Sequence, residues 1–246
     1  MRVIDLTVMN ATKARHTGDQ RVSAILAELR ALGSEKHRAG MARYGINVER
    51  AFGVSIYELR KVAKRLGADH GLALALWATG NHEARLLAGF VDDPAAVTPQ
   101  QMHAWAGDFD SWDICDQACT SLFDQTAHAW SKAVVWAKRD EEWIKRGGYA
   151  LMAGLAWHDK TTGSQAFLKL LPLIERGAGD DRNFVKKAVN WALRQIGKRN
   201  KNLNRAAIKA AREIRDLDSS SARWIAADAL RELESSAVQR RLSRKK

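Results

Sequence analysis

Apolar residues recur along most of the chain at the three-to-four-residue spacing of amphipathic helices, and alternating runs typical of strands are nearly absent. The sequence holds only 3 prolines, and its abundant Ala, Leu, Arg and Lys favour helix. The pattern therefore predicts an all-α protein. Helices are expected near residues 20–32, 35–44, 55–66, 70–78, 81–91, 99–106, 112–123, 127–137, 141–157, 164–176, 181–198, 203–215 and 219–234.

Several of these helices open alike, with acidic or polar residues, then a basic residue, then a small or apolar run. If Arg146, Lys187 and Arg223 are equivalent, their successive offsets are 41 and 36 residues. HEAT and armadillo helix pairs repeat at about 40 residues. The spacing predicts a right-handed α-solenoid of HEAT-like or armadillo-like repeats with a concave basic face, and an irregular helical bundle is the alternative.

No segment has the composition of a linker, and 46% of the residues are hydrophobic, which is ample for a core. We therefore expect a single HEAT-like repeat domain over residues 1–238. The basic residues at the end of the chain predict a disordered tail over residues 239–246, which adds electrostatic attraction to a polyanion.

Charge is unevenly distributed along the chain, which carries +12 overall. From Trp143 to Lys209 there are 14 basic and 4 acidic residues, whereas Asp92 to Glu142 holds 10 acidic and 3 basic residues. A basic surface beside an acidic centre suits a polyanion that carries a cationic feature, and DNA is the obvious candidate. The alternative is a solvated surface with uneven charge.

Other classes of protein are disfavoured. Asp5 interrupts the apolar run in Met1 to His16, so no signal peptide is expected, and the stretch from Tyr149 to Trp157 is too short to span a bilayer. We expect a cytoplasmic protein, associated with the nucleoid if the source is bacterial. Cys115 and Cys119 lie one helical turn apart and are interpreted as small buried thiols, and the histidines lack zinc-site spacing, so no metal or other cofactor is expected.

Aromatic and basic residues share one side of the helix predicted from residue 181. At about 100° per residue, one side is apolar from Val185 to Ile196. The other side carries Lys186, Lys187, Asn190, Trp191 and Arg194. An indole among cations can press on a sugar or base while the cations hold phosphates, although packing between repeats would also explain Trp191.

The helix over residues 141–157 places Arg146 on a side with the small residues Gly147, Ala150, Ala153 and Gly154 and with Trp157. Small side chains allow another body to approach closely. That body is either DNA or a neighbouring helix, and the sequence does not decide between them.

The segment FDSWDICDQACTSLFD, residues 109–124, places Asp116 one turn after Trp112, with Asp113 on the same polar edge. The helix dipole favours ionised carboxylates in the first turns, so Asp116 offers a negative charge next to an aromatic wall. Alone, this spacing is also explained by a capped helix with solvated acids.

Four segments in the same order resemble the AlkD-type DNA alkylation repair family of HEAT-like repeat DNA glycosylases. They are MARYGINVERAFGVSIYELRKVAK (41–64), SWDICD (111–116), EEWIKRGGYAL (141–151) and NFVKKAVNWALRQIGKRN (183–200), and the similarity spans residues 20–235. The resemblance implies an α-solenoid that holds duplex DNA and releases N3- and N7-alkylated purines without flipping the base into a pocket.

The resemblance also implies roles for individual residues. Asp116 matches the catalytic carboxylate, Trp112 and Trp191 match paired aromatics at the sugar and backbone of the lesion, Arg146 matches a cation beside it, and Tyr44 matches a further aromatic. Two departures concern the lesion geometry: Tyr44 is followed by a glycine, and a Gly-Gly pair follows Arg146.

The leading hypothesis is a DNA glycosylase for cationic alkylpurines, acting as a monomer on double-stranded DNA. A cationic purine leaves without a general acid, so one carboxylate and aromatic faces suffice to stabilise the sugar cation, and no cofactor is needed. The second hypothesis is a non-catalytic protein that binds DNA structures through the same groove. The third is an armadillo-like scaffold for an acidic or extended peptide, on which Trp191 is hard to explain.

Overall fold

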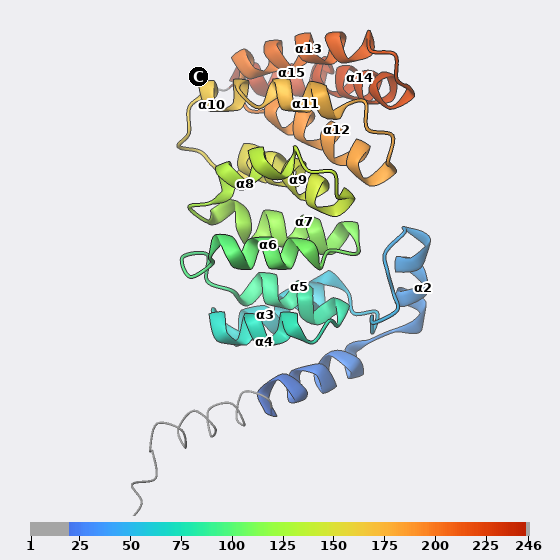
Figure 1. Cartoon of the computed structure of the whole chain (residues 1–246), viewed down its shortest axis with the longest axis vertical. Helices are drawn as coiled ribbons and strands as arrows, with labels where there is room; N and C mark the ends of the chain where they lie inside the picture. Colours follow the sequence, from blue (N-terminus) through green and yellow to red (C-terminus); the bar gives the residue numbers. More distant parts are fainter. Residues whose placement is uncertain (1–19, 245–246) are drawn as a thin grey trace, which may run out of the picture. The chain divides into compact units, whose positions relative to one another are not determined.

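The computed structural model describes residues 20–244, and these residues are helical with no strand (Figure 1). They divide into two compact units, one ending at Val97 and one starting at Thr98, where the sequence predicts a single domain over 1–238. Met1 to His16, in which no signal peptide is expected, and Lys245 and Lys246 of the predicted tail lie outside the described residues.

In the first unit, a buried acid organises the loop before α3. Glu83 is fully buried and accepts hydrogen bonds from the backbone N–H groups of Phe52 (2.9 Å), Gly53 (2.7 Å) and Val54 (3.2 Å). Helices α3 and α4 both pack on α5, which carries this acid. The helices of this unit are one over residues 20–32, α2 (Glu35–Arg43), α3 (Ile56–Leu66), α4 (His70–Ala78) and α5 (His82–Val91).

The second unit is a stack of helices that runs from α6 and α7 at one end to α13, α14 and α15 at the other (Figure 1). Helix α9 packs on α7, α8 and α12, and α12 packs on α13 and α14, so α7, α9, α12 and α14 form one continuous layer. Its elements are α6 (Pro99–Gly107), α7 (Trp112–Ser121), η1 (Phe123–Gln125), α8 (Ala129–Trp136), α9 (Glu142–His158), α10 (Ser164–Leu168), α11 (Leu171–Gly177), α12 (Asn183–Gly197), α13 (Lys201–Arg215), α14 (Ser220–Leu233) and α15 (Ser236–Arg244).

The centre of the second unit is α9, which is buried at every residue from Arg146 to Ala156. Its glycines explain how the neighbours come so close. A Cβ on Gly148 would lie 2.3 Å from the backbone nitrogen of Ala137, at the end of α8, and one on Gly147 would lie 3.3 Å from the Trp136 ring. The body that approaches these small residues is therefore the neighbouring helix.

Two predicted elements differ from the structure. The helix expected over residues 164–176 is split into α10 and α11, because Pro172 has no backbone N–H to continue the first helix and sits instead in the first turn of the second. The disordered tail predicted over residues 239–246 is wrong up to Arg244. Val238 and Leu242, one turn apart, are buried in α15, and Gln239 donates to the Leu233 carbonyl oxygen at 2.7 Å.

Candidate nucleic-acid interface

The candidate site centres on an ion pair between α7 and α9. Nε of Arg146 donates to Oδ1 of Asp116 at 2.9 Å, and Nη2 donates to Oδ2 at 2.7 Å. The side chain of Arg146 is 6% exposed and that of Asp116 is 14% exposed. A forked guanidinium that meets both oxygens fixes the plane of the carboxylate, so the orientation of Asp116 is set by Arg146.

The surroundings of the pair act on both protonation equilibria. Burial raises the pKa of Asp116 above its ordinary value, Arg146 opposes that shift, and the nearby charge of Asp113 adds to it. Burial also disfavours charge on Arg146, but attraction to Asp116 more than compensates and holds its pKa above the ordinary value. Since a guanidinium stays protonated, the pair brings one positive and one negative charge into a nearly water-free place.

Arg146 also connects α9 to α12. Its Nη1 donates to the backbone carbonyl oxygen of Phe184 at 2.5 Å, and the Phe184 ring lies 5.0 Å from that of Trp143, centroid to centroid. Sequence reasoning missed Phe184, because a contact through a backbone carbonyl leaves no signature in side-chain patterns. One arginine of α9 therefore joins α7, which carries Trp112 and Asp116, to α12, which carries Trp191.

The two tryptophans expected at the site are both partly exposed. Trp112 opens α7, one turn before Asp116. Trp191 lies two turns after Phe184 on α12, so both residues lie on the same side of that helix. Asp113 is also partly exposed and accepts a hydrogen bond from the backbone N–H of Ile114 at 3.0 Å.

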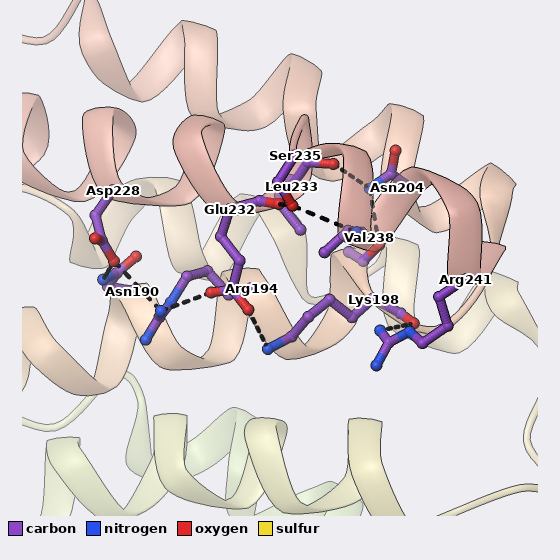
Figure 2. Close-up of polar contacts among 11 residues, drawn as sticks. Asn190, Arg194, Lys198, Asn204, Asp228, Glu232, Leu233, Ser235, Val238 and Arg241 are labelled. Carbon is purple, nitrogen blue, oxygen red and sulfur yellow. Dashed lines mark hydrogen bonds and ion pairs between the residues drawn. The ribbon is translucent and has the colours of Figure 1, made fainter.

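The polar side of α12 is less open than the sequence predicts (Figure 2). Asn190 is only 2% exposed and donates to Asp228 at 2.7 Å, and Arg194 donates to Glu232 at 2.6 Å. These two side chains lie against α14 because acids of that helix face them. The expectation of an open polar side is therefore wrong at Asn190.

The other two cations of this side lie differently. Lys187 is exposed to solvent. Lys186 is partly exposed, and its ammonium lies 5.2 Å from the centroid of the Trp224 ring on α14, within the range of a cation–π contact. The open part of the predicted face thus consists of Lys186, Lys187 and Trp191.

Tyr44, the further aromatic, belongs to the first unit. It forms the C-cap of α2 and is 76% exposed. The glycine that follows it has a φ of 75°, a left-handed conformation that glycine adopts without strain, so the departure at Gly45 ends the helix directly after the tyrosine.

The cysteines are buried and free, as the sequence predicts. Sγ of Cys119 lies 3.6 Å from the Gly147 carbonyl oxygen, and burial raises the pKa of this thiol well above its usual range. Between residues 20 and 244, no group of acidic, histidine or cysteine side chains is arranged to hold a metal ion. No helix in that range is long and apolar enough to cross a membrane.

Comparisons with known proteins identify the fold from a solved structure and the family from a family model. One solved structure, described as "a new family of proteins related to the HEAT-like repeat DNA glycosylases with affinity for branched DNA structures", matches with a TM-score of 0.74 at 22% identity. The match covers 89% of this chain and 95% of that chain, which establishes the HEAT-like repeat fold. No curated protein matches. The family described as "DNA alkylation repair enzyme" matches residues 25–233, and the chain belongs to it.

Proposed function

We propose that this protein is a DNA glycosylase that binds duplex DNA and hydrolyses the N-glycosidic bond of cationic N3- and N7-alkylated purines without flipping the base. Family membership supports a role in DNA alkylation repair. The observation that carries the finer proposal is the bidentate pair between Asp116 and Arg146, with a partly exposed tryptophan on each flanking helix.

The proposed chemistry needs little beyond a positioned carboxylate. An alkylated purine already carries positive charge, so it leaves without a general acid, and positive charge develops on the sugar as the bond breaks. A carboxylate fixed beforehand stabilises that charge and orients the attacking water. Electron-rich indole faces at Trp112 and Trp191 add to the stabilisation of the cation.

Arg146 acts in this proposal as a positioning residue. An ionised carboxylate has about four lone-pair directions, and the two hydrogen bonds from Arg146 occupy two of them. The remaining directions are available to water or to the sugar. The exposed Lys187 and the partly exposed Lys186 contact phosphates and hold the duplex, with no metal or cofactor.

A second function is favoured by the same ion pair. Because Arg146 neutralises Asp116, the pair contributes less net negative charge to a sugar cation than a free carboxylate would. A protein with this fold that binds DNA structures without excision is the alternative, and the matched structure comes from a family described by its affinity for branched DNA.

The test must separate chemistry from stability, since Asp116→Asn leaves the buried Arg146 charge without its partner. Breaking a buried pair on one side costs about 3–5 kcal/mol. The double variant Asp116→Asn/Arg146→Gln removes both charges together, so it should recover much of that stability. If the carboxylate performs the chemistry, the single-turnover rate of methylated purine release should fall by a factor of about 100 or more in both variants.

The control is Asp180→Asn, which breaks a partly buried ion pair of α9, that between Lys145 and Asp180 at 3.2 Å. It should lower the unfolding temperature and leave base release unchanged. Release at the wild-type rate by the double variant would refute the catalytic role of Asp116. A wild-type protein that binds duplex DNA and releases no cationic base would be a DNA-structure binder instead.

A further inference from the structure

A cationic pocket lies at the far end of α9, away from Arg146. Its volume is about 460 Å³, within the range of about 300–1,000 Å³ typical of small-molecule sites. The ends of α9 and α12 and one residue of α15 form its walls. The residues that characterise it are Trp157, Lys160, Gln195, Lys198, Arg199 and Arg241.

The cations of the pocket are held in place by backbone carbonyls at helix ends. Arg199 donates to the carbonyl oxygens of Ala156 at 2.9 Å and Asp159 at 2.5 Å, and Lys160 donates to that of Trp157. Arg241 donates to the carbonyl oxygen of Lys198 at 3.0 Å (Figure 2). The carbonyl end of a helix carries a partial negative charge that repels anions. Because the cations bind these carbonyl oxygens, the bonds reduce that repulsion and also hold the cations in place.

The local charge remains positive after two nearby acids, Glu232 and Asp159, are counted. Lys198 pairs with Glu232 at 2.6 Å, and that carboxylate also binds Arg194 (Figure 2). Within the described residues, no acidic side chain lines the pocket itself. Asp159 acts electrostatically on Arg199, so Lys160 and Arg241 supply the excess positive charge of the pocket.

Trp157 stands out in α9 because its indole is 58% exposed directly after a run of buried residues. The ring stacks on that of His158, with centroids 5.4 Å apart and planes at 26°. Leaving an indole exposed to water is energetically costly. Proteins that bind single-stranded nucleic acid combine exposed aromatic rings with cations, so that a base stacks on the ring while the cations bind the phosphate.

The pocket and the candidate site share one helical layer. Arg146 and Trp157 are eleven residues apart, so at 1.5 Å and 100° per residue they lie about 16 Å apart along α9 and roughly 20° apart around it. Trp191 and Lys198 are likewise related by two turns of α12. A strand that passes the ion pair along this layer reaches the pocket after a few nucleotides.

We propose that this pocket binds a nucleotide of an unpaired DNA strand, with its base on Trp157 and its phosphate between Lys160, Arg199 and Arg241. The ligand is unpaired because a base inside a duplex is stacked on both faces and cannot reach the indole. The inference rests on the DNA binding of the proposed function, although not on its chemistry.

The experiment compares two undamaged DNA duplexes, one blunt and one with a five-nucleotide single-stranded overhang, tested at each end polarity. By fluorescence anisotropy, the wild-type protein should bind one overhang duplex at least about five-fold more tightly than the blunt duplex. Trp157→Ala should abolish that preference and leave blunt-duplex affinity unchanged, while Trp157→Phe, which keeps an aromatic face, should retain most of it.

Arg241→Gln should also reduce the preference. Arg240→Gln is its matched control, because it removes the same charge from an exposed neighbour on α15 that does not line the pocket. Equal affinity of the wild type for both duplexes, or equal weakening of both by Trp157→Ala, would overturn the inference. If either outcome is found and the wild type still releases bases from damaged duplex, the proposed function stands and only the pocket inference fails. If the wild type binds no DNA, the inference and the proposed function both fail.

Discussion

Asp124 is a buried acid of the second unit that the proposed chemistry does not use. Its Oδ2 lies 2.5 Å from Nδ1 of His158, and its Oδ1 is buried with no hydrogen-bond partner in the described part of the chain. Burial raises the pKa of Asp124 to about 6, and the hydrogen bond with His158 opposes that rise. The ionised form is therefore disfavoured in the folded protein relative to the unfolded chain.

This shift gives stability a definite dependence on pH. The folded-state pKa is above the ordinary value of 3.8, so the contribution of Asp124 is fully present below about pH 4 and is lost as the pH rises through about 6. Asp124→Asn should match the wild type near pH 4 and be more stable at pH 7, by about 3 kcal/mol at most. Chemical denaturation at both pH values measures the difference.

Asp180 provides the control of opposite sign, because its ion pairs and hydrogen bonds lower its pKa to about 2 in spite of burial. Its contribution is present above about pH 4 and is lost as the pH falls toward 2. Asp180→Asn should therefore be less stable than the wild type at pH 7. A difference between Asp124→Asn and the wild type that stays constant from pH 4 to pH 7 would contradict the assignment.

Local spacing in the sequence predicts which residues are neighbours on one helix. At the candidate site it does not predict the contacts between helices. Trp112 and Asp116 are one turn apart, and this relation is visible in the sequence. The partner of Asp116 lies 30 residues away on another helix, and the pattern around Arg146 does not reveal it. Asn190 fails for the same reason, since its burial depends on an acid of α14 at position 228.

At the scale of elements, close helix packing in the second unit depends on glycines at specific positions. Gly148→Ala would place a Cβ 2.3 Å from the nitrogen and 2.8 Å from the Cα of Ala137, so backbone would have to move. We expect a loss of about 3 kcal/mol in unfolding free energy, at the upper end of the cost of overpacking.

Gly40→Ala is the matched control, since Gly40 is also helical and a Cβ there would meet nothing within 4 Å. It should stabilise the protein by about 0.5–1 kcal/mol, because alanine loses less backbone entropy than glycine on folding. Thermal and denaturant unfolding of both variants measure these changes. A Gly148→Ala variant as stable as the wild type would show that α8 and α9 can separate without cost.

Helix positions follow from amphipathic spacing, and the sequence predicts nearly every element of both units. The exceptions have local causes. Pro172 divides one predicted helix because its ring cannot continue the hydrogen-bonding of α10. The amphipathic pattern of α15 is weak in the sequence because most of its residues are polar or basic. Within this helix, only Val238 and Leu242 mark the buried side. Two apolar residues in a basic run are a weak signal without the surface that covers them.

For the whole molecule, net charge overstates the charge available to a partner. Many residues of the acidic segment are internal or paired: Asp92 and Asp124 are buried, and Asp116 binds Arg146. Cations of α12 are paired as well, because Arg194 and Lys198 both contact Glu232. Of the two cations Lys187 and Arg194, which the sequence places on the same polar side, Lys187 is exposed, whereas Arg194 is partly exposed and paired with Glu232.

The salt dependence of duplex binding is the measurement that distinguishes these cations. Each phosphate that the protein neutralises contributes about −0.9 to the slope of log K against log salt concentration, through release of counterions. Lys187→Glu should make the slope shallower by about 1, with unchanged stability, because the side chain is exposed. Arg194→Glu should instead lower stability, since it places a third acid beside Glu232 and Asp228.

Lys209→Glu is the matched control: it reverses an exposed lysine of α13, outside the layer of α7, α9, α12 and α14, and should leave the slope unchanged. Because long-range attraction from net charge would weaken equally in the two exposed variants, a shallower slope for Lys187→Glu alone identifies a direct phosphate contact. An affinity of the wild type that does not change with salt would exclude the phosphate backbone as the principal source of binding.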